Sequence, residues 1–516
     1  MKLASVDLIS QIDAFARERL SLSEETLIRR AGEAVASALF DEGCYPENAT
    51  FPLTVILCGG GNNGADGYAA ALSLAARGVP TVAVDVFGKG QRSEGGKALL
   101  AEYVEKLGAP YTLDRLPELA DAGVFVDAML GTGVSGELPE AGRIAARFMS
   151  RREAYRLAVD IPFGVNATDG TVDADALSAH ATVVLSYMKK GLLSYPAKEK
   201  CGKLILADIG LDIPAVHKAF PRLEEGVSDE LIRSLLPPRF ADSHKGSYGK
   251  AVLLCGSRKY RGAAVLASYG ALRTGVGLLT LASERDVILM MGKKLPEAIY
   301  HELPPMSEWT EKEIEEAVAL AEGASSLLVG PGCGKTEALY RVVLRLLSTE
   351  GCPIVLDADA LGALAMHPEE AEIALSTAKR PVLMTPHPLE LSRLIGVPVQ
   401  KIQANRMNIA RETAKRFGVS LLLKGAATVI ASGDTLYVNT TGSSALAKGG
   451  SGDVLSGVVA AFTAAGVSPV HALLLGAYLH GKAGDSLAEE LSEYGVLPSD
   501  LPRQIAVEIA RLTKSK

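Results

Sequence analysis

Three stretches in the first half of the chain combine glycines with asparagine or aspartate, residue types that bind polar ligands. CGGGNNGADG, residues 58–67, follows an apolar run and precedes a helix-like run. VDAMLGTGVSGELP, from Val126, and VDIPFGVNATDG, from Val159, follow apolar runs in the same way. Ligands of open parallel sheets bind beyond the carboxyl ends of the strands, where glycine lets the backbone approach them closely. The stretches therefore predict one ligand site, with the polar candidates Asn62, Asp66, Asp127 and Asp160.

These residues also fit two alternative roles. Gly59, Gly61 and Gly64 fit the dinucleotide fingerprint, and Asp85 follows about twenty residues later, so an NAD-dependent oxidoreductase is one hypothesis. Asp127 and Asp160 could also do no more than cap turns. Hydride transfer does not require asparagine and two acids at one sheet edge, whereas hard oxygen ligands indicate a cation. Taken together, the polar residues favour a ligand site with a bound cation.

The second half carries ALAKGGSGDVLSGVVAAF, residues 445–462. Glycines before a buried helix leave backbone N–H groups unpaired at its positive end, which predicts a site for a phosphoryl group. Asp453, in the first turn, suits such a site if it takes a proton from an attacking hydroxyl. Helix capping is the alternative role for this aspartate. The three glycines just before it favour phosphoryl transfer.

Two further motifs in the second half are ambiguous or misleading. His387 lies between two prolines in TPHPLE and is either a turn residue or a site residue. GPGCGKT, residues 330–336, resembles a phosphate-binding P-loop, but G-x-x-x-x-G-K-[ST] would require glycine at Val329. Cys333 in that segment has no evident catalytic partner. We therefore predict no P-loop here.

Apolar, β-branched runs alternate with alanine-rich helical runs along the chain, a pattern typical of parallel α/β sheets. An early helix has Leu27, Ala31, Val35 and Leu39 on one face. Strands are predicted at 53–58, 81–87, 123–130, 155–162, 181–187 and 203–210, then at 249–256, 277–283, 325–332, 352–359, 380–387, 420–432 and 435–442.

Two helices are expected to close the chain. The first, residues 453–466, is apolar nearly all round and should be buried, ending at Gly466. The second should begin with Ser468 as N-cap and Pro469 at its first position. Between the two strand series, residues 214–238 lose periodicity and are predicted to form a linker with an entry helix. The domains predicted are 1–213 and 239–516.

The composition limits the function classes. A chain of 516 residues with 48% hydrophobic and 22% charged residues predicts at least two globular domains. A net charge of -7 without a basic run gives no surface for nucleic acid or an anionic membrane, and no segment is long and apolar enough to span one. The six scattered cysteines indicate neither disulfides nor zinc, so we expect a cytoplasmic protein that binds small molecules.

The first half resembles a known family. GGGNNGADGYAAA, VDAMLGTGVSGEL and AVDIPFGVNATDG are similar to the three signatures of the NAD(P)HX epimerase domain, over residues 1–213. That resemblance implies a Rossmann-like three-layer fold and interconversion of the two epimers of hydrated NADH or NADPH. It also implies a potassium ion held by Asn62, Asp127 and, through its backbone carbonyl only, Phe163. The family usually has serine at Phe163 and glycine at Ala65, so this chain departs from the pattern twice.

The same resemblance implies roles for the loop residues. Asp160 is expected to be catalytic and to contact the reacting nicotinamide ring. The implied substrate-binding residues are Gly61, Asn62, Asn63, Gly64, Ala65, Asp66, Gly131, Thr132, Gly133, Val134, Ser135, Gly136, Glu137 and Asp160.

The second half resembles the ADP- or ATP-dependent NAD(P)HX dehydratase domain, from about Arg239 to Val507. The segments that carry this resemblance are HKGSYGKAVLLCGS, RGAAVLASYGALRTGVGLLTLAS, LLVGPGCG, VLDADAL, TPHPLE, KGAATVI and the G-x-G-D element of ribokinase-like kinases. A ribokinase-like α/β/α fold is implied. So are hydrate-binding roles for Ala263, Gly332, His387 and Asp453, although Leu389 stands where the family usually has glycine.

The implied nucleotide-binding residues are Lys424, Gly425, Ala426, Ala427, Thr428, Gly449, Gly450, Ser451 and Gly452. Asp453 is expected to act as the base that lets the hydrate's hydroxyl attack the terminal phosphate of the donor. Phosphate then leaves more readily than hydroxide. Magnesium is expected to arrive with ADP or ATP, and ADP is the expected donor.

Both halves point to one substrate, hydrated NADH or NADPH, and to a bifunctional repair enzyme that is expected to be a homo-oligomer. One alternative is a ribokinase-like small-molecule kinase with an NAD-binding first domain, which would make a stable phosphorylated product. Another is a first domain that binds without catalysis.

Overall fold

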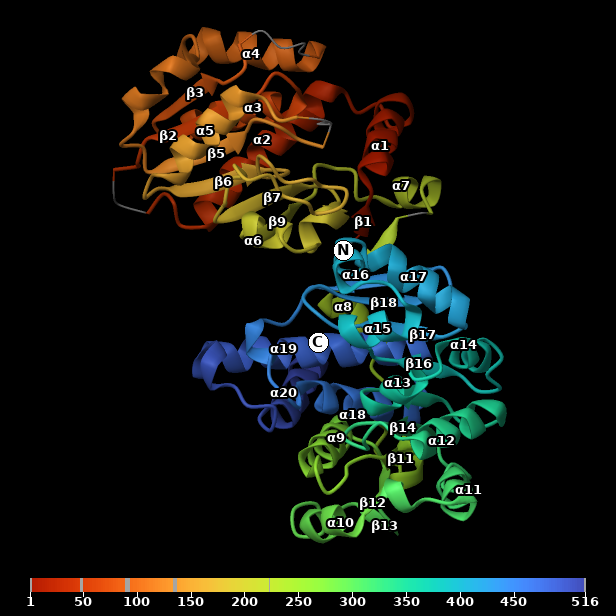
Figure 1. Cartoon of the computed structure of the whole chain (residues 1–516). Coiled ribbons are helices and arrows are strands. Elements are labelled where there is room, and N and C mark those ends of the chain that lie inside the picture. The colour runs from red at the N-terminus through yellow and green to blue at the C-terminus, as the bar shows by residue number, and fades with distance from the viewer. Residues whose placement is uncertain (1, 47–49, 89–92, 133–136, 222, 515–516) are drawn as a thin grey trace. The chain divides into compact units, whose positions relative to one another are not determined.

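The computed structural model describes residues 2–46, 50–88, 93–132, 137–221 and 223–514. The chain divides into a first unit, Met1–Glu224, and a second unit, Glu225–Lys516. This division falls inside the segment 214–238, which is predicted above as a linker. The segment contains α7 (Pro214–Ala219), β10 (Glu224–Gly226) and α8 (Asp229–Leu235). Figure 1 shows the elements of both units.

The first unit is built on a parallel sheet with the strand order β4-β3-β2-β5-β6-β7-β9. The strands are β2 (Thr54–Cys58), β3 (Thr81–Asp85), β4 (Tyr111–Thr112), β5 (Val124–Ala128), β6 (Tyr155–Val159), β7 (Ala181–Leu185) and β9 (Lys203–Ala207). The six strands predicted for this half are confirmed, and β4 was not predicted. Because β2, β5 and β6 are neighbours, the three glycine- and acid-rich stretches that follow them meet at one sheet edge.

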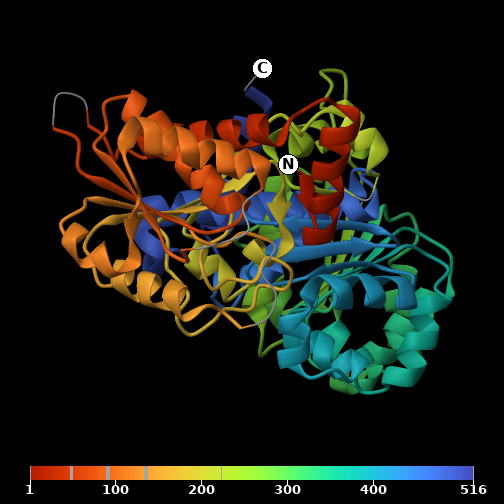
Figure 2. The same ribbon diagram turned by 90° about the horizontal axis from the view of Figure 1, so that it is seen from above.

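Helices cover both faces of this sheet, which Figure 2 shows from above. The helices on one face are α2 (Glu24–Asp41), α3 (Asn62–Ala76) and α4 (Glu94–Leu107); the other face carries η1 (Leu113–Leu119) and α5 (Glu140–Ser150). The predicted apolar face of α2, with Leu27, Ala31, Val35 and Leu39, is buried. The prediction of a three-layer α/β domain is confirmed.

The N-terminal segment belongs to the first unit. Strand β1 (Lys2–Ala4) pairs in parallel with the short strand β8 (Met188–Lys189). Ser5 caps α1 (Val6–Arg19) by accepting the N–H of Leu8, and α1 buries its apolar face against residues of the 209–223 segment. The remaining short elements are η2 (Lys190–Leu193) and α6 (Ala197–Cys201).

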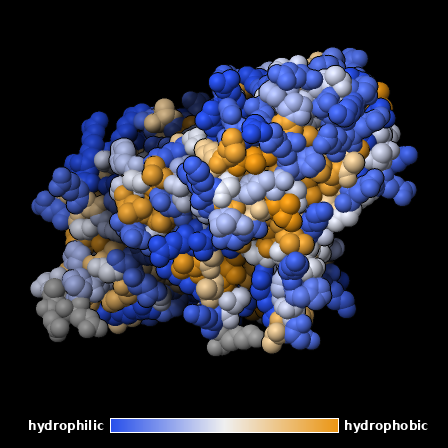
Figure 3. All heavy atoms as spheres, turned by 90° about the horizontal axis from the view of Figure 1, so that it is seen from below, coloured by the Kyte–Doolittle hydropathy of each residue, from blue (hydrophilic) through white to orange (hydrophobic). Residues whose placement is uncertain are grey.

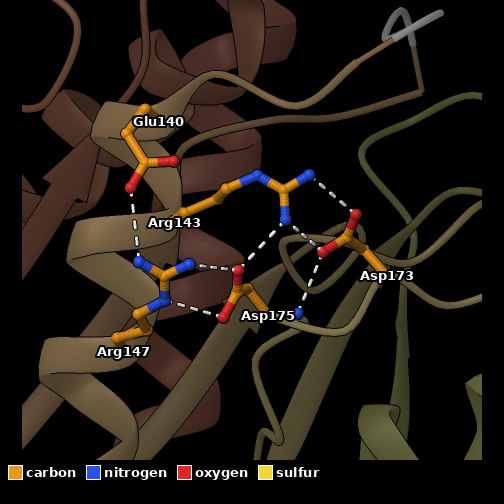
Figure 4. Close-up of polar contacts among 5 residues, drawn as sticks. All are labelled: Glu140, Arg143, Arg147, Asp173 and Asp175. Carbon is orange, nitrogen blue, oxygen red and sulfur yellow. Dashed lines mark hydrogen bonds and ion pairs between the residues drawn. The ribbon is translucent and has the colours of Figure 1, made fainter.

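A network of ion pairs ties α5 to the segment that follows β6 (Figure 4). Arg143 forms a two-pronged pair with Asp173, with N···O distances of 2.6 and 2.9 Å, and also contacts Asp175 at 3.0 Å. Arg147 binds the same Asp175 with two hydrogen bonds of 2.7 and 2.6 Å. These hydrogen bonds from both guanidinium groups lower the pKa of Asp175 to about 2. The network anchors the end of the loop that begins at Asp160.

The second unit contains a larger sheet with the order β13-β12-β11-β14-β15-β16-β17-β18-β19-β10. Its strands are β11 (Lys250–Leu254), β12 (Leu278–Glu284), β13 (Ile299–Leu303), β14 (Ser326–Val329), β15 (Ile354–Leu356), β16 (Val382–Met384), β17 (Ser420–Leu423), β18 (Thr428–Ser432) and β19 (Thr435–Asn439). All the pairs are parallel except those of β18, which runs antiparallel to both β17 and β19.

Two strand predictions for the second half need correction. The run 420–432 was predicted as one strand, but it forms the hairpin β17–β18, because Gly425 (φ +137°) and Ala427 (φ +53°) turn the chain between the two apolar runs. Strand β13 was not predicted, since IYHEL is neither a continuous apolar run nor a regular alternation, with His301 and Glu302 adjacent in a strand at the edge of the sheet.

Helices cover both faces of this sheet as well. Toward one face lie α9 (Arg261–Thr274), α18 (Ser451–Ala464), α19 (Pro469–Gly495) and α20 (Leu501–Lys514). The others are α10 (Arg285–Met291), α11 (Glu311–Ala319), α12 (Glu337–Ser348), α13 (Asp359–Leu364), α14 (Pro368–Ser376), α15 (Pro388–Ile395), α16 (Val399–Ala404) and α17 (Arg406–Phe417), with 3-10 turns η3 (Lys245–Tyr248), η4 (Met306–Glu308) and η5 (Ser444–Leu446).

The predicted helices near the C-terminus are confirmed, with one addition. Helix α18 is buried almost throughout, and Gly466 follows it with φ +84°. Helix α19 begins at Pro469 after Ser468. The chain does not close with these two helices, because α20 packs its amphipathic face against α9 and α19.

The surface mixes hydrophilic and apolar residues on the face that Figure 3 shows, without an apolar belt on that face. Within the ranges described above, no helix is long and apolar enough to cross a membrane.

Candidate active sites

The first unit contains a cavity of about 470 Å³ at the carboxyl edge of its sheet. The predicted residues that line it are Gly61, Asn62, Asn63, Asp66, Gly131, Thr132 and Asp160. Four charged residues that were not predicted from the sequence also line it: Asp13 and Arg17 from α1, Glu24 from α2 and Lys189 from β8. A cavity of this size suits a small-molecule ligand.

Close packing explains the glycines between β2 and α3. A Cβ atom on Gly59 would lie 1.8 Å from the carbonyl oxygen of Met129, and one on Gly64 would lie 2.0 Å from the carbonyl oxygen of Gly59. No side chain fits at either position. This packing brings the start of α3 against the loop after β5, so that Asn62, Asn63 and Gly131 line the same cavity.

Asp160 directly follows β6 and lies in the left-handed region, with φ +66°. One carboxylate oxygen accepts the N–H of Leu185 at 3.0 Å and forms an ion pair with Lys189. Lys189 also donates to the carbonyl oxygen of Leu185, at 2.9 Å. The side chain of Lys189 is only 1% exposed, so the pair is shielded from bulk water while lining the cavity.

The cavity holds further carboxyl groups in a different electrostatic state. Burial raises the pKa of Asp66 well above its ordinary value, and the nearby charges of Asp160 and Asp13 raise it further. Burial also raises the pKa of Asp13, to about 6. One cavity therefore combines the Asp160–Lys189 ion pair with two carboxyl groups whose pKa values are raised. Such a combination is suited to proton transfer.

The residues predicted to bind potassium differ in their burial and their hydrogen bonds. Asp127 is fully buried, and its carboxylate accepts the N–H groups of Met129, at 3.1 Å, and Phe163, at 2.7 Å. The side-chain amide of Asn62 is turned toward Glu24 instead, at 3.3 Å. The Oδ1 atom of the next residue, Asn63, is buried and accepts no hydrogen bond from any residue that the structure describes. That orphaned oxygen is the better fit to a cation.

The backbone of Phe163, which is predicted to bind potassium, is already hydrogen-bonded. Its N–H donates to Asp127, its carbonyl oxygen accepts the N–H of Leu177 at 3.0 Å, and its ring is fully buried against Gly142. The ring of Phe163 is part of the core on this face of the sheet.

Several other residues that the sequence predicts as ligand-binding in this unit do not line the cavity or lie outside the described residues. Asp85 accepts the N–H of Gly88 at 3.1 Å and does not line the cavity, so the oxidoreductase fingerprint does not assemble into a site. Gly64 and Ala65 pack inside α3 and are not part of the cavity lining. Gly133, Val134, Ser135 and Gly136 lie outside the described residues, and Glu137 is exposed at the end of that gap.

In the second unit, helix α18 begins where the glycines of the predicted phosphoryl site end. Gly450 has φ +105°, which favours glycine, and precedes the helix. The hydroxyl of Ser451 is buried and finds no partner in the described part of the chain. The buried His480 lies with Nε2 3.0 Å from the carbonyl oxygen of Ser451. A helix start with an unpartnered hydroxyl provides donors for a phosphate.

A lysine lies beside this helix start. A Cβ atom on Gly452 would lie 3.4 Å from Nζ of Lys424. The same ammonium group is 2.8 Å from Asp357 and 3.8 Å from Glu390. Burial lowers the pKa of Lys424, but the attraction of these two carboxylates outweighs burial and raises it. Lys424 therefore stays cationic next to the N-terminus of α18, as phosphate binding requires.

Asp453 lies in the first turn of α18 and is half-buried. Burial, followed by repulsion from Asp357, raises its pKa to about 7. A carboxyl group that titrates near neutrality is well suited to take up a proton and release it again. This setting favours the base role over simple capping, because Gly450 and not Asp453 occupies the N-cap position of this helix.

The hairpin turn 424–428 is held by a residue that was not predicted from the sequence. Arg406 is buried and donates to the carbonyl oxygens of Leu423 and Lys424, at 3.0 and 3.1 Å. Burial lowers the pKa of Arg406 to about 10. Ala427 has φ +53°, a left-handed conformation that strains the turn. The hydrogen bonds from Arg406 to the two carbonyl oxygens stabilise the turn.

His387 takes the turn role, one of the two that the sequence left open. Its Nδ1 accepts the N–H groups of Leu389 and Glu390, each at 3.2 Å, and so caps α15. Burial and the charge of Lys424 lower its pKa, which places it in the same electrostatic cluster as Lys424. Leu389 is exposed and leaves the cap intact.

Ala263 and Gly332 adjoin each other. A Cβ atom on Gly332, which has φ +68°, would lie 2.7 Å from that of Ala263. Across the described residues, no hydrogen bond or ion pair joins these two to the Lys424 cluster. The nearby Cys333 is buried and donates to the carbonyl oxygen of Leu254 at 3.1 Å, a structural role.

Both units match families of known proteins. Residues 24–191 match the family described as YjeF-related protein N-terminus, and residues 251–506 match the family described as NAD(P)H-hydrate dehydratase. The bifunctional NAD(P)H-hydrate repair enzyme Nnr of Thermofilum pendens is 34% identical over 506 residues, covering 96% of this chain and 94% of that protein. The chain belongs to the family of bifunctional NAD(P)H-hydrate repair enzymes.

Other members of this repair-enzyme family are similarly related. The Escherichia coli protein of the same name is 32% identical, covering 94% of this chain and 90% of its own length. Among solved structures, the ADP/ATP-dependent NAD(P)H-hydrate dehydratase from Bacillus subtilis, co-crystallized with ATP/Mg2+, is 35% identical and covers 55% of this chain and 96% of its own, with a TM-score of 0.48.

Several residues of this repair enzyme's candidate sites were not predicted from the sequence: Asp13, Lys189, Asp357, Glu390 and Arg406. Asp357 follows an apolar strand just as Asp160 does, so the same signal could have identified it. Asp13 and Lys189 carry no comparable signal, because only the pairing of β1 with β8 brings them to the cavity edge.

Proposed function

We propose that the first unit interconverts the epimers of hydrated NADH or NADPH, and that the second unit dehydrates one epimer with a phosphoryl donor, giving NADH or NADPH, AMP and phosphate when the donor is ADP. The observation that carries the second assignment is the cluster of Lys424, Gly452 and Asp453 at the start of α18. The full-length relationship to bifunctional repair enzymes supports the first.

The proposed dehydration begins with the hydrate's hydroxyl beside Asp453. Asp453 takes the hydroxyl proton as the oxygen attacks the terminal phosphorus of the donor. Lys424 and the N–H groups of α18 hold the phosphate oxygens and offset their charge. The resulting phosphate ester breaks at its C–O bond with loss of a ring proton, and the ring double bond is restored. We propose that the turn 425–428 borders the nucleotide and that Ala263, Gly332 and His387 border the hydrate.

We propose that two metal ions complete the sites. Asp127, through its buried carboxylate, and Asn63, through its orphaned Oδ1, would hold potassium in the first unit. Asn63 suits a cation better than Asn62 or Phe163 does. Its charge would offset the burial of Asp127. Magnesium would be held mainly by the donor's phosphates and would neutralise them during transfer.

We propose that Asp160 contacts the reacting ring and that the loop 131–137 borders the substrate. We also propose a cytoplasmic location, since the cysteines form no disulfide in the described part of the chain. Assembly into a homo-oligomer remains a prediction.

Product analysis tests this function against a small-molecule kinase. Hydrated NADH should give NADH, AMP and phosphate in equal amounts when ADP is the donor. A stable phosphorylated product without NADH would instead identify a kinase, and Asp453→Asn should abolish product formation in either case.

A further inference from the structure

Lys189 is a buried cation to which the chemistry proposed above gives no role. Its strand, β8, is only two residues long and is held by β1, with Ala4 opposite Lys189. The ammonium group lies at the end of the cavity that also contains Asp160, Asp66 and Asp13. Transfer of an ammonium group out of water is costly unless its charge is used or paired.

Holding Asp160 in place does not by itself require a lysine. The carboxylate of Asp160 already accepts the N–H of Leu185, and its backbone N–H donates to the carbonyl oxygen of Val183 at 2.8 Å. Hydrophobic residues of similar volume often replace both members of a buried ion pair without loss of stability, so stability of the fold alone does not require this pair. A purely structural role therefore leaves the charge of Lys189 unexplained.

The hydrogen bonds of Lys189 leave one donor for a ligand. An ammonium group has three N–H bonds. Within the described residues, one contacts Asp160 and one the carbonyl oxygen of Leu185. These two hydrogen bonds leave the third N–H without a partner in that part of the chain, and Lys189 lines the cavity together with Asp66 and Asp13, whose carboxyl groups respond to its charge.

We propose that Lys189 is a catalytic residue of the epimerase reaction, in which its ammonium group protonates the departing hydroxyl of the hydrate. This inference rests on the proposed function of the first unit. The two epimers differ at the ring carbon that carries the hydroxyl and adjoins the ring nitrogen, so inversion requires a bond at that carbon to break and re-form.

The reaction balances through one proton. Nζ gives a proton to the hydroxyl oxygen, the C–O bond breaks, and water leaves. The lone pair of the ring nitrogen forms a C=N bond, so the positive charge moves from Lys189 to the ring. Water then adds to the other face of the same carbon and returns its proton to the neutral amine. The carboxylate of Asp160, which pairs with Lys189, compensates the positive charge in both states.

The test measures epimer interconversion on the full-length chain. Lys189→Met should lower kcat by roughly 100- to 10,000-fold with little change in KM, because general acid catalysis contributes that much. Lys190→Met is the matched control: the neighbouring lysine pairs with Glu224 at 2.6 Å and does not line the cavity. It should interconvert epimers at the rate of the unaltered chain.

A rescue experiment separates proton transfer from a structural role. Methylammonium added to Lys189→Ala should restore part of the lost rate in proportion to its concentration, and other amines should do so according to their pKa values. Full activity in Lys189→Met would overturn the proposal, and so would a folded Lys189→Ala that no amine rescues. Loss of first-unit structure in both variants would assign Lys189 to folding and overturn it as well.

The epimerase activity of the unaltered chain distinguishes failure of this inference from failure of the proposed function on which it rests. If it does not interconvert the epimers, the epimerase assignment fails and the proposal fails with it. If it does so and Lys189→Met is equally active, only the role of Lys189 is wrong. The dehydratase activity of every variant reports on the second unit and should remain unchanged.

Discussion

At the scale of single residues, the second unit depends on the protonation state of Asp453. Its pKa is raised to about 7, by burial first and then by the charge of Asp357. A base must be ionised before it can take a proton, so protonation at low pH inactivates the site. The kcat/KM of dehydration should therefore fall about tenfold per unit as the pH decreases below about 7.

Asp453→Asn checks this assignment through the pH profile. The variant should lose roughly 100- to 10,000-fold in kcat, and any remaining activity should show no break near neutrality. Dehydration that breaks at the same pH in the variant would show that another group is the base.

Lys424 is expected to bind the phosphoryl donor and also lowers the pKa of Asp453. Removing the ammonium group in Lys424→Met leaves the buried Asp357 unpaired and removes a charge that lowers the pKa of Asp453. The KM for the donor should rise at least about tenfold, and the break in the pH profile should move upward. Lys415→Met is the control, since Lys415 pairs with the exposed Asp434. An unchanged profile in Lys424→Met would separate Lys424 from the catalytic cluster.

At the scale of elements, the crossing of α9 and α18 fixes the position of the phosphoryl site. A Cβ atom on Gly457 would lie 2.0 Å from the carbonyl oxygen of Ala267, and one on Gly270 would lie 2.5 Å from that of Val454. The two helices approach this closely only because both residues are glycines. The start of α18 is thereby set relative to the sheet.

Gly457→Ala should push these helices apart. We expect the second unit to lose about 1–3 kcal/mol in its free energy of unfolding, measured by urea denaturation followed through dehydratase activity, with epimerase activity retained. Gly262→Ala in the exposed start of α9, where no atom lies within 4 Å of the added Cβ, is the control and should not destabilise. Equal stability of the two variants would contradict the close packing of α9 and α18.

Some elements and site residues were predictable from the sequence, and others were not. Strands with continuous apolar runs, such as β2 and β5, and the glycines that follow them were predictable, because parallel strands are buried on both faces and end at one edge. The two-residue strand β8 carries no periodicity, so the place of Lys189 depended on tertiary pairing. Asp357 and Arg406 act through contacts with a distant hairpin, which no local pattern encodes.

At the scale of the whole molecule, the two units perform complementary steps of the proposed repair. A dehydratase that accepts one epimer clears a mixture only if the other epimer is converted. Asp160→Asn should therefore let an epimer mixture recover only to the share of the accepted epimer, with an unchanged initial rate, as followed by product absorbance. Complete recovery at the normal rate would show that the first unit binds without catalysis.

The most direct test of the repair function is the recovery of reduced-nicotinamide absorbance when the full-length chain meets an epimer mixture of hydrated NADH with ADP, or separately with ATP. We predict complete recovery, with ADP as the effective donor. Absence of recovery with either donor would contradict the repair function.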